Sequence, residues 1–344
     1  MKILYGVQAT GNGHISRSRE VIAQLKKQGH SVHVIFSGRY PATIFDVDIF
    51  KPFSAFKGFT FAIENGSINK FKTALSLDLI QFFKDISSFD ASEFDLAIVD
   101  FEPLTSRIAK KHKIPLIGIG HQYAFKYKIP KAKCNPLDTI IMNLFAPADF
   151  NLGLHWHHFN LPLLPPIIPD IKRQNDKVIQ NKIVVYLPFE SPLFLKEIFA
   201  KFANYEFFIY AVSKEFVDEK NLHWRPASRK DFLNDLIEAN GVITNAGFEL
   251  PSEAIHLGKK LFVIPVAGQL EQESNALAIQ QLKLGISERK LTCDSLRNWL
   301  ENFNSNGYLY PQCAPEIAKW IESGNWHKIS VLSEKLWQQT NFNP

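Results

Sequence analysis

Residues 244–276 read TNAGFELPSEAIHLGKKLFVIPVAGQLEQESNA, and they predict a strand, a turn and a helix in that order. An apolar strand ends at Thr244, and the helix that follows the turn is stopped by Gly258. The first N–H groups of a helix have no partner inside the helix, and the helix dipole attracts anions to that end. The sequence therefore predicts a diphosphate site without any lysine, formed by the backbone of Asn245, Ala246, Gly247 and Phe248.

Polar side chains near this turn could accept hydrogen bonds from the hydroxyl groups of a ligand. Glu253 lies two turns into the predicted helix, where its carboxylate can accept two hydrogen bonds from a ribose diol. After the next strand, a second turn leads into another helix beside the same cleft. Acceptors and amides there suit the hydroxyl groups of a sugar, and the candidates are Gln269, Glu271 and Gln272.

Strand-like and helix-like segments alternate on both sides of this stretch. The expected strands are 2–7, 31–36, 94–99, 115–119, 183–187, 205–212, 241–244 and 261–265, and the expected helices are 15–28, 71–89, 104–111, 228–239, 248–257 and 271–282. This alternation predicts parallel sheets covered by helices on both faces. We expect an α/β protein with two doubly wound, Rossmann-like domains that face a cleft at the carboxyl ends of their strands.

A proline-rich segment separates the two halves. Residues 161–180, LPLLPPIIPDIKRQNDKVIQ, contain four prolines followed by polar residues, a composition typical of a linker. We therefore expect one domain over 1–160 and a second over 181–325. Residues 326–344 are expected to form a C-terminal helix, with a return to the first domain as one option.

A glycine-rich turn follows the first strand at residues 7–14, VQATGNGH. Gly11 and Gly13 let the backbone turn sharply and approach a ligand at the N-terminus of the next helix. A dinucleotide-binding fingerprint would need a third glycine where Ser16 stands. A tight turn without any ligand is the alternative. His14 would begin the helix facing the cleft, with a pKa useful for proton transfer.

An apolar strand of the first half ends in Asp100, which would emerge into the same cleft. A carboxylate against one imidazole nitrogen fixes the tautomer and stabilises the imidazolium that forms when the other nitrogen takes a proton. His14 and Asp100 are therefore the candidate catalytic pair. Asp100 could instead cap the helix that begins near Pro103, and Asp95 and Glu102 are rival acids.

The positive charge is concentrated in the first half of the chain. The net charge is +5, and residues 1–160 hold 19 Lys/Arg against 13 Asp/Glu. Residues 107–133 carry eight basic side chains and no acid, with aromatic residues interleaved near the end. This run is a solvated face, an edge strand, or a surface for a phosphorylated acceptor, an acidic lipid surface or nucleic acid. The lysines expected to face such a partner are Lys126, Lys128, Lys131 and Lys133.

Composition excludes several classes of protein. With 46% hydrophobic and 21% charged residues, the 344-residue chain can bury a core and is not a disordered polymer. Its three cysteines are far apart, which fits a reducing compartment and argues against a structural zinc site. No apolar run approaches the roughly 18 residues of a membrane-spanning helix, and no signal peptide is expected. We expect a cytoplasmic protein, with peripheral contact at the inner membrane surface as one option.

The segment 244–276 resembles the donor-binding region of GT-B-fold glycosyltransferases, especially the branch with plant small-molecule glucosyltransferases and the bacterial lipid-linked GlcNAc transferase. That branch has a pattern near T/S-H/R-x-G-W/A-x-S/T-x-x-E, then G-x-P, P and E/D-Q-x-x-N-A. The matching residues are Thr244, Gly247, Phe248, Glu253, Gly258, Pro265, Glu271, Gln272, Asn275 and Ala276. GNGH and FDLAIVD similarly resemble the family's glycine-rich turn with its general base and the strand that ends in the supporting acid.

The resemblance implies an inverting glycosyltransferase of the hexosyltransferase type. The first domain would bind the acceptor, a sugar, a lipid-linked compound or another hydroxyl compound, and the second a UDP or dTDP sugar as co-substrate. His14 would be the general base and Asp100 its support. No cofactor is expected, and no metal either, because the Asp-x-Asp motif at 46–48 lies well before the strand of Asp100. A nucleotide-sugar epimerase of the same fold, and a non-catalytic protein that binds nucleotide sugars or nucleic acid, are the alternatives.

By the same resemblance, the loop at 222–230, LHWRPASRK, would read the base of the nucleotide. Its candidate residues are Trp224, Arg225 and Ala227, with a place in the core as the alternative for Trp224. Ser191 would approach the phosphates, or would only cap a helix.

The chain also departs from the family pattern. Asn245 takes the place of a His or Arg that often touches the diphosphate, and Lys259 and Lys260 replace a small residue and a proline. Glu249 and Leu250 stand where polar residues often contact phosphate. A carboxylate at Glu249 would repel a diphosphate unless its side chain turns away.

Overall fold

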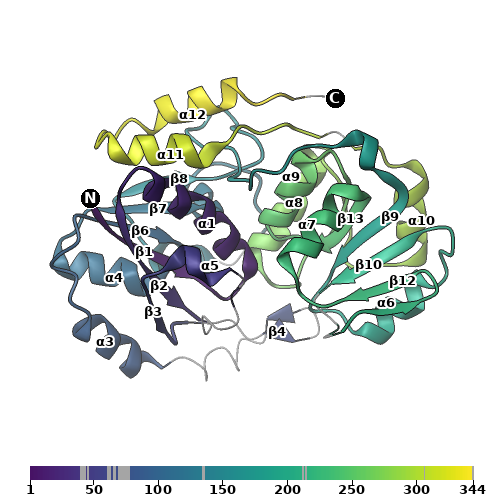
Figure 1. Ribbon diagram of the computed structural model, residues 1–344, viewed down its shortest axis with the longest axis horizontal. Coiled ribbons are helices and arrows are strands. Elements are labelled where there is room, and N and C mark those ends of the chain that lie inside the picture. Colours follow the sequence, from purple (N-terminus) through teal and green to yellow (C-terminus); the bar gives the residue numbers. More distant parts are fainter. Residues whose placement is uncertain are drawn as a thin grey trace.

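The protein folds into two α/β domains that lie side by side (Figure 1). The computed structural model describes residues 1–38, 44, 46–59, 63–64, 67–68, 78–133, 136–210, 213, 215–305 and 307–342. Each domain is built on one largely parallel sheet with helices on both faces, which confirms the fold class predicted from the sequence.

The first domain has a six-stranded parallel sheet in the order β3-β2-β1-β6-β7-β8. Its strands are β1 (Lys2–Gln8), β2 (Ser31–Ser37), β3 (Phe53–Phe56), β6 (Leu96–Asp100), β7 (Leu116–Gly120) and β8 (Phe150–Gly153). Its helices are α1 (Asn12–Lys27), α3 (Leu79–Ser88), α4 (Pro103–His112) and α5 (Pro136–Phe145), with 3-10 turns at Val47–Phe50 and His121–Lys126 and a small hairpin of β4 (Ile63–Glu64) and β5 (Ser67–Ile68). Residues 71–77 of the expected helix 71–89 lie outside the described residues.

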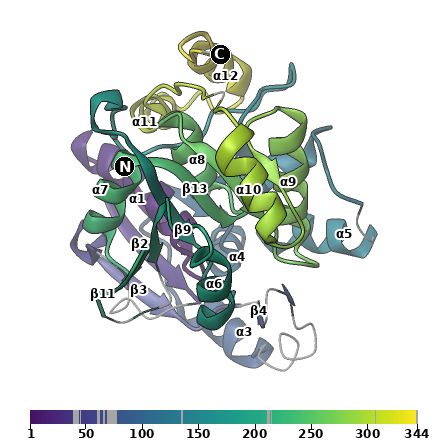
Figure 2. The same cartoon turned by 90° about the vertical axis from the view of Figure 1, so that its right-hand side faces the viewer.

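The second domain has a seven-stranded sheet in the order β11-β12-β10-β9-β13-β14-β15, in which only β11 is antiparallel. Its strands are β9 (Ile179–Tyr186), β10 (Glu206–Tyr210), β11 (Val217–Glu219), β12 (Leu222–Arg225), β13 (Ala239–Asn245), β14 (Lys260–Ile264) and β15 (Ile286–Ser287). Its helices are α6 (Pro192–Phe199), α7 (Arg229–Glu238), α8 (Glu249–His256), α9 (Leu270–Gln281) and α10 (Cys293–Asn302), with a 3-10 turn at Asn175–Lys177 before β9. Helices α6 and α10 pack on one face of the sheet, in the foreground of Figure 2.

The strand order explains why residues far apart in sequence meet at one place. In the first sheet β1 lies between β2 and β6, and Val7 at the end of β1 stands opposite Asp100. In the second sheet β9 lies between β10 and β13, and Tyr186 stands opposite Thr244. At such points the connections leave the sheet in opposite directions and open a crevice, which is where ligands of these folds bind.

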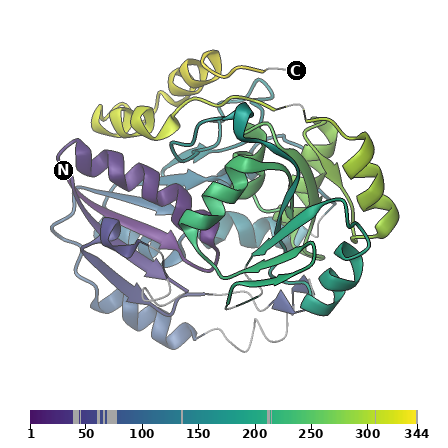
Figure 3. The same cartoon turned by 45° about the vertical axis from the view of Figure 1, so that its right-hand side comes forward.

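The proline-rich segment and the C-terminal tail both pack on the first domain. Within 161–180, Leu163, Leu164, Ile167 and Ile168 are buried, and β9 already begins at Ile179. The tail forms α11 (Cys313–Glu322), which packs against α1, and α12 (Ile329–Gln338). Figure 3 shows these yellow helices lying over the first domain. The part of the tail that lies on the first domain therefore includes α11. This helix begins before residue 326, where the sequence placed the boundary.

Candidate active site

His14 and Asp100 lie in contact at the crevice of the first domain. His14 Nδ1 is 2.7 Å from Asp100 Oδ1. Asp100, the last residue of β6, is fully buried, whereas the side chain of His14 keeps 17% of its surface exposed. Because Nδ1 faces the carboxylate, Nε2 is the nitrogen that can take a proton from a ligand. The structure thus brings together the two residues that the sequence singled out.

The rival acids have other roles. Glu102 is buried and caps α4, because its carboxylate accepts hydrogen bonds from the N–H groups of Leu104 and Thr105 at 2.7 Å and 2.6 Å. Burial raises the pKa of Glu102. Asp95 accepts a hydrogen bond from a backbone N–H group at the protein surface. The cap of α4 is therefore Glu102, and Asp100 does not have the capping role that the sequence left open.

Arg17 joins this pair and was not singled out from the sequence. Its side chain is 1% exposed and donates from Nε to Asp100 Oδ2 at 2.8 Å and from Nη2 to Oδ1 at 2.5 Å. Burial favours the protonated form of Asp100, but the charges of Arg17 and His14 outweigh it and lower the pKa of this carboxyl group. The spacing of three residues from His14, which places both side chains on one helix face, was the available signal.

Asp100 in turn changes the basicity of His14. Burial disfavours the imidazolium form of His14, but the charge and the hydrogen bond of Asp100 outweigh burial and raise the pKa of this histidine. Arg17 acts against this rise, and Glu249 adds to it. The geometry therefore produces a histidine that is a stronger base than usual, oriented by a carboxylate.

Glu249, the first residue of α8, turns toward the first domain. Its Oε1 accepts a hydrogen bond from Arg17 Nη1 across the domain boundary. Its other oxygen lies over Gly13, where an added Cβ would come within 2.6 Å of Oε2. A larger residue at position 13 would therefore force the Glu249 carboxylate to shift. The Glu249 side chain therefore turns away from the turn before α8. This is the condition under which a diphosphate can bind there without repulsion from the Glu249 carboxylate.

The turn before α8 presents unused backbone donors. Among the described residues, the N–H groups of Gly247, Phe248, Glu249 and Leu250 have no recorded hydrogen-bond partner. A Cβ added at Gly247 would meet nothing within 4 Å, so the turn is open on the side to which a side chain at Gly247 would point. The carbonyl of Ala246 is held by Asn275 Nδ2 at 3.0 Å, and the side chain of Asn245 donates to the carbonyl of Ile264 at 3.0 Å. A rigid helix N-terminus with free donors is a ready anion site.

The side chain of Phe248 points away from this space into an aromatic stack at the domain boundary. It lies parallel to the ring of His121, with ring centroids 4.2 Å apart and an interplanar angle of 7°, and 5.0 Å from the ring of Trp156. Trp156 Nε1 also donates to Ser252 Oγ in α8 at 2.8 Å. Phe248 can therefore contact a ligand only through its backbone. His121 and Trp156 belong to the first domain and carried no sequence signal for this role.

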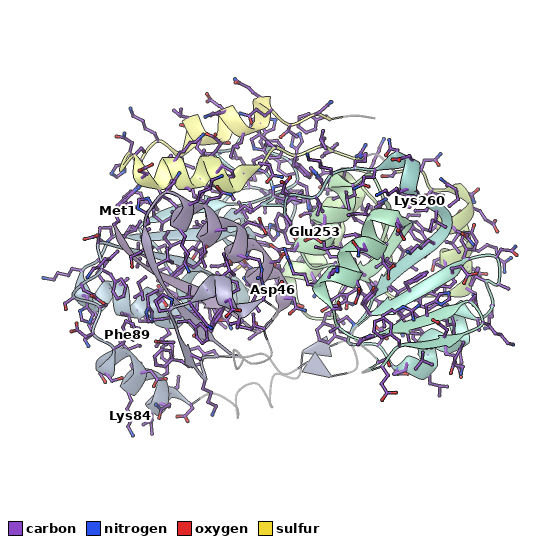
Figure 4. All side chains as sticks on the ribbon, viewed as in Figure 1. Met1, Asp46, Lys84, Phe89, Glu253 and Lys260 are labelled. Carbon is purple, nitrogen blue, oxygen red and sulfur yellow. The ribbon has the colours of Figure 1, made fainter. Side chains whose placement is uncertain are left out.

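Glu253 is buried at the side of the second domain that faces the first (Figure 4). Burial raises its pKa to about 8, and the charge of Glu249 adds to the rise while Arg229 opposes it. Arg229 lines a cavity of about 510 Å³ together with Ala227, Asp46, Ile171 and the outer residues of α7. Of the residues expected to contact the nucleobase, Ala227 therefore borders a space that could hold a ligand.

The residues at the start of α9 divide into two groups. Glu271 accepts hydrogen bonds from Gln122 Nε2 of the first domain at 3.1 Å and 3.0 Å, and the charge of His14 acts on it. Gln269 has a buried Oε1 that has no hydrogen-bond partner in the described parts of the chain. Gln272 Oε1, in contrast, accepts the N–H group of Val266 at 2.9 Å and so shapes the preceding turn. Glu271 and Gln269 remain candidates for ligand contacts, and Gln272 has an internal role.

The side chains of three other candidate residues make contacts inside the second domain. Trp224 is 7% exposed and packs in the core of the second domain, so its side chain cannot contact the nucleobase of a donor. Arg225 donates to Asp218 Oδ1 at 2.7 Å and lies over the ring of Phe208. Ser191 Oγ caps α6 by accepting the N–H group of the third following residue at 3.1 Å. The alternative roles that the sequence allowed for Trp224 and Ser191 are the ones found.

The basic segment does not form the edge strand that was one of the options left open by the sequence. Residues 121–126 form a 3-10 turn in which Tyr123 and Phe125 are buried, so these rings do not face a lipid surface. The four lysines are exposed. Lys126 donates to Asn151 Oδ1 at 2.8 Å and Lys131 to the carbonyl of Phe125 at 2.5 Å. Contact of Lys126, Lys128, Lys131 and Lys133 with an anionic partner stays a prediction.

No group of three or more His, Cys, Asp or Glu side chains within the described ranges is placed to hold a metal ion. No helix in this part of the chain is both long enough and apolar enough to cross a bilayer.

Two Rossmann-like domains that face each other across a crevice are the architecture of GT-B glycosyltransferases. The model of the family described as Glycosyl transferase family 1 matches residues 1–304. The chain belongs to this family and is a glycosyltransferase. No curated protein matches it.

Solved structures of glycosyltransferases are similar over nearly the whole chain. The glycotransferase of kitacinnamycin is 15% identical, with 96% of this chain and 95% of that chain covered and a TM-score of 0.60. SnogD from Streptomyces nogalater is 13% identical, with 98% and 99% covered and a TM-score of 0.55. The spinosyn rhamnosyltransferase SpnG complexed with thymidine diphosphate is 12% identical, with 98% and 96% covered and a TM-score of 0.58. These similarities support the fold.

Proposed function

We propose that the protein is an inverting, metal-independent glycosyltransferase that moves a sugar from a UDP or dTDP sugar to an acceptor hydroxyl, with His14 as the general base. The observation that carries this proposal is the contact of Arg17 with both Asp100 and Glu249. Through this contact, His14 of the first domain is linked to the first residue of α8 in the second domain. A general base and an anion site on opposite sides of a crevice are what a single displacement at a sugar carbon requires.

The chemistry follows from this arrangement. The acceptor oxygen attacks the anomeric carbon from the side opposite the diphosphate, while its proton passes to His14 Nε2. The bond from the anomeric carbon to the diphosphate oxygen breaks, and the electron pair leaves with the diphosphate. The N–H groups of Gly247–Leu250 stabilise this developing charge, and Asp100 stabilises the imidazolium. A single displacement inverts the configuration at the anomeric carbon.

The nucleoside of the donor would lie beside α7 and α8. Glu253 supplies the acceptor for the ribose diol, and the cavity beside Ala227 gives space for the base. The thymidine diphosphate in the similar SpnG structure supports a nucleoside diphosphate as the leaving group. Gln269 and Glu271, at the N-terminus of α9, are the proposed contacts of the sugar hydroxyls, with Gln122 of the first domain orienting Glu271.

A donor assay with and without acceptors tests the proposal. A glycosyltransferase releases UDP or dTDP when a hydroxyl acceptor is present and forms a product of inverted configuration. An epimerase would convert the donor sugar without an acceptor and without inverted transfer. A nucleic-acid-binding protein would show affinity that falls steeply with salt. A thermal-shift screen of nucleoside diphosphates identifies the donor class, because a ligand of the folded state raises the melting temperature.

Replacing the acid proposed to hold the ribose should weaken nucleotide binding. We expect Glu253→Ala to raise the Kd for UDP or dTDP by about 5- to 150-fold, corresponding to about 1–3 kcal/mol for a diol that loses its acceptor. Titration calorimetry measures the change. Glu288→Ala, at an exposed position, is the control variant. An unchanged Kd in a folded Glu253→Ala protein would remove Glu253 from the donor site.

Nucleotide affinity should also depend on pH through the same carboxyl group. The pKa of Glu253 is raised to about 8, so at pH 7 most of the free protein carries the protonated form. The diol needs the ionised form as a double acceptor, so binding releases a proton. We expect affinity to rise about fivefold from pH 7 to pH 8 and to level off above about pH 9, at roughly tenfold over its value at pH 7. Calorimetry in two buffers of different ionisation enthalpy measures the released proton, and Glu253→Gln should abolish the release.

A further inference from the structure

The carboxylate of Asp100 is saturated with hydrogen-bond donors. Its Oδ1 receives His14 Nδ1 at 2.7 Å and Arg17 Nη2 at 2.5 Å. Its Oδ2 receives Arg17 Nε at 2.8 Å and Ser18 Oγ at 3.1 Å. A histidine–carboxylate pair needs only the first of these contacts. The guanidinium of Arg17 therefore requires its own explanation, because a buried cation beside a base makes that base weaker.

Arg17 also competes with Asp100 for the same imidazole nitrogen. Arg17 Nη2 lies 3.1 Å from His14 Nδ1, close enough to donate to it. Nδ1 can donate to Asp100 or accept from Arg17, but it cannot do both in one neutral tautomer. Only the first tautomer leaves Nε2 free of a proton, and only that tautomer can act as a base toward the cleft. A guanidinium free to donate to Nδ1 would therefore favour the inactive tautomer.

Glu249 binds the same guanidinium group. It accepts from Nη1, the one terminal nitrogen that Asp100 does not use, and it reaches Arg17 from the other domain. Charged groups face His14 from four elements, which are Arg17 on α1, Asp100 on β6, Glu249 on α8 and Glu271 on α9. Arg17 is the only cation among these four. A carboxylate that partly neutralises it therefore makes His14 more basic.

We propose that Glu249 is a positioning residue that acts through Arg17, holding His14 in the tautomer and at the basicity that proton abstraction needs. The base is then completed by the second domain, since the residue that starts the donor-binding helix also controls the base. The catalytic role of Glu249 rests on the proposed function. Its effect on the protonation of His14, in contrast, is a property of the folded protein and can be measured without a substrate. Contact between the domains would thus activate the base at the place where the donor binds.

Nitrogen NMR of the histidine side chain tests the coupling directly. With 15N-labelled histidine, the nitrogen shifts of His14 report which ring nitrogen carries the proton, and a pH titration gives its pKa; His14→Gln assigns the signals. In Glu249→Gln, which keeps the size of the side chain and removes its charge, we expect the pKa of His14 to fall by about 0.5–1 unit. The population with the proton on Nε2 should rise. Glu288→Gln, the same change at an exposed site, should leave both quantities unchanged.

A second variant and a kinetic measurement make the result decisive. Glu249→Asp keeps the charge but shortens the side chain by one methylene, so we expect a smaller change in the same direction. In transfer assays, the acid limb of the kcat/KM profile should move to lower pH in Glu249→Gln, with a lower plateau, because a weaker base transfers protons less effectively.

The NMR titration of His14 tests the coupling, and the transfer assay tests the proposed function. An unchanged His14 titration and tautomer in a folded Glu249→Gln protein would overturn the coupling, even if transfer activity is found. A shifted titration in a protein that transfers no sugar from any donor would support the coupling and count against the proposed function.

Discussion

Replacing His14 by alanine is expected to lower kcat for sugar transfer by about 10²–10⁴-fold, the range lost with a general base. Nucleotide affinity should stay nearly unchanged, because the proposed donor contacts come from α8, α9 and the cavity beside Ala227. Initial rates of nucleoside diphosphate release give kcat, and titration calorimetry gives the affinity. The expected result is therefore a protein that binds its donor and does not transfer the sugar.

The control for this experiment is His327→Ala, a second histidine at an exposed position. It should retain full activity. Undiminished transfer by His14→Ala would refute the base assignment, and a loss of donor affinity equal to the loss of rate would instead make His14 a binding residue.

Replacing Asp100 by alanine is expected to lower the free energy of unfolding by about 3–5 kcal/mol. The substitution removes the acceptor of a guanidinium that is 1% exposed, so a buried positive charge loses its main partner. Urea denaturation monitored by circular dichroism measures the loss. Transfer activity should fall as well, because His14 loses the group that fixes its tautomer.

A double variant separates the charge effect from the loss of packing. Replacing Arg17 by Leu in the Asp100→Ala protein removes both charges of the buried pair and should restore much of the lost stability. Glu249, which keeps 17% of its side chain exposed, can then be hydrated. A single Asp100→Ala protein as stable as the wild type would contradict the buried ion pair on which this expectation depends.

The fold could be predicted from sequence because its signals are local. Alternating apolar runs and amphipathic segments mark each βα unit, and the carboxyl ends of parallel strands share one edge of a sheet. For this reason the sequence could assign the end of β1, which leads to His14, and Asp100 to the same edge of the sheet. The open turn at Gly247 was visible in the same way, as the end of a strand followed by a helix.

The contacts between the domains could not be predicted in this way. Arg17 and Glu249 are 232 residues apart, and neither position carries a pattern that points to the other. The side chain of Gln272 matches a family motif, yet it is used inside its own turn. Such pairings depend on how the two sheets are set against each other, and periodicity within one segment contains no information on that.

The basic aromatic segment shows how a short alternation can mislead. Tyr123 is buried because Gly118 on β7 leaves room for it, and a Cβ at Gly118 would lie 2.3 Å from Tyr123 Cζ. A glycine in a neighbouring strand thus decides the direction of an aromatic ring five residues later. An alternation with a period of two predicts a strand, but over so few residues tertiary packing can override it.

The aromatic stack around Phe248 also gives the molecule a built-in optical reporter. The indole of Trp156 belongs to the first domain, lies against Phe248 of the second and is fully shielded from water. Any separation of the domains must hydrate this ring, and a hydrated indole emits at longer wavelength. A separation of the domains can therefore be followed by intrinsic fluorescence as the difference between the wild type and Trp156→Phe, because Trp156 is one of six tryptophans.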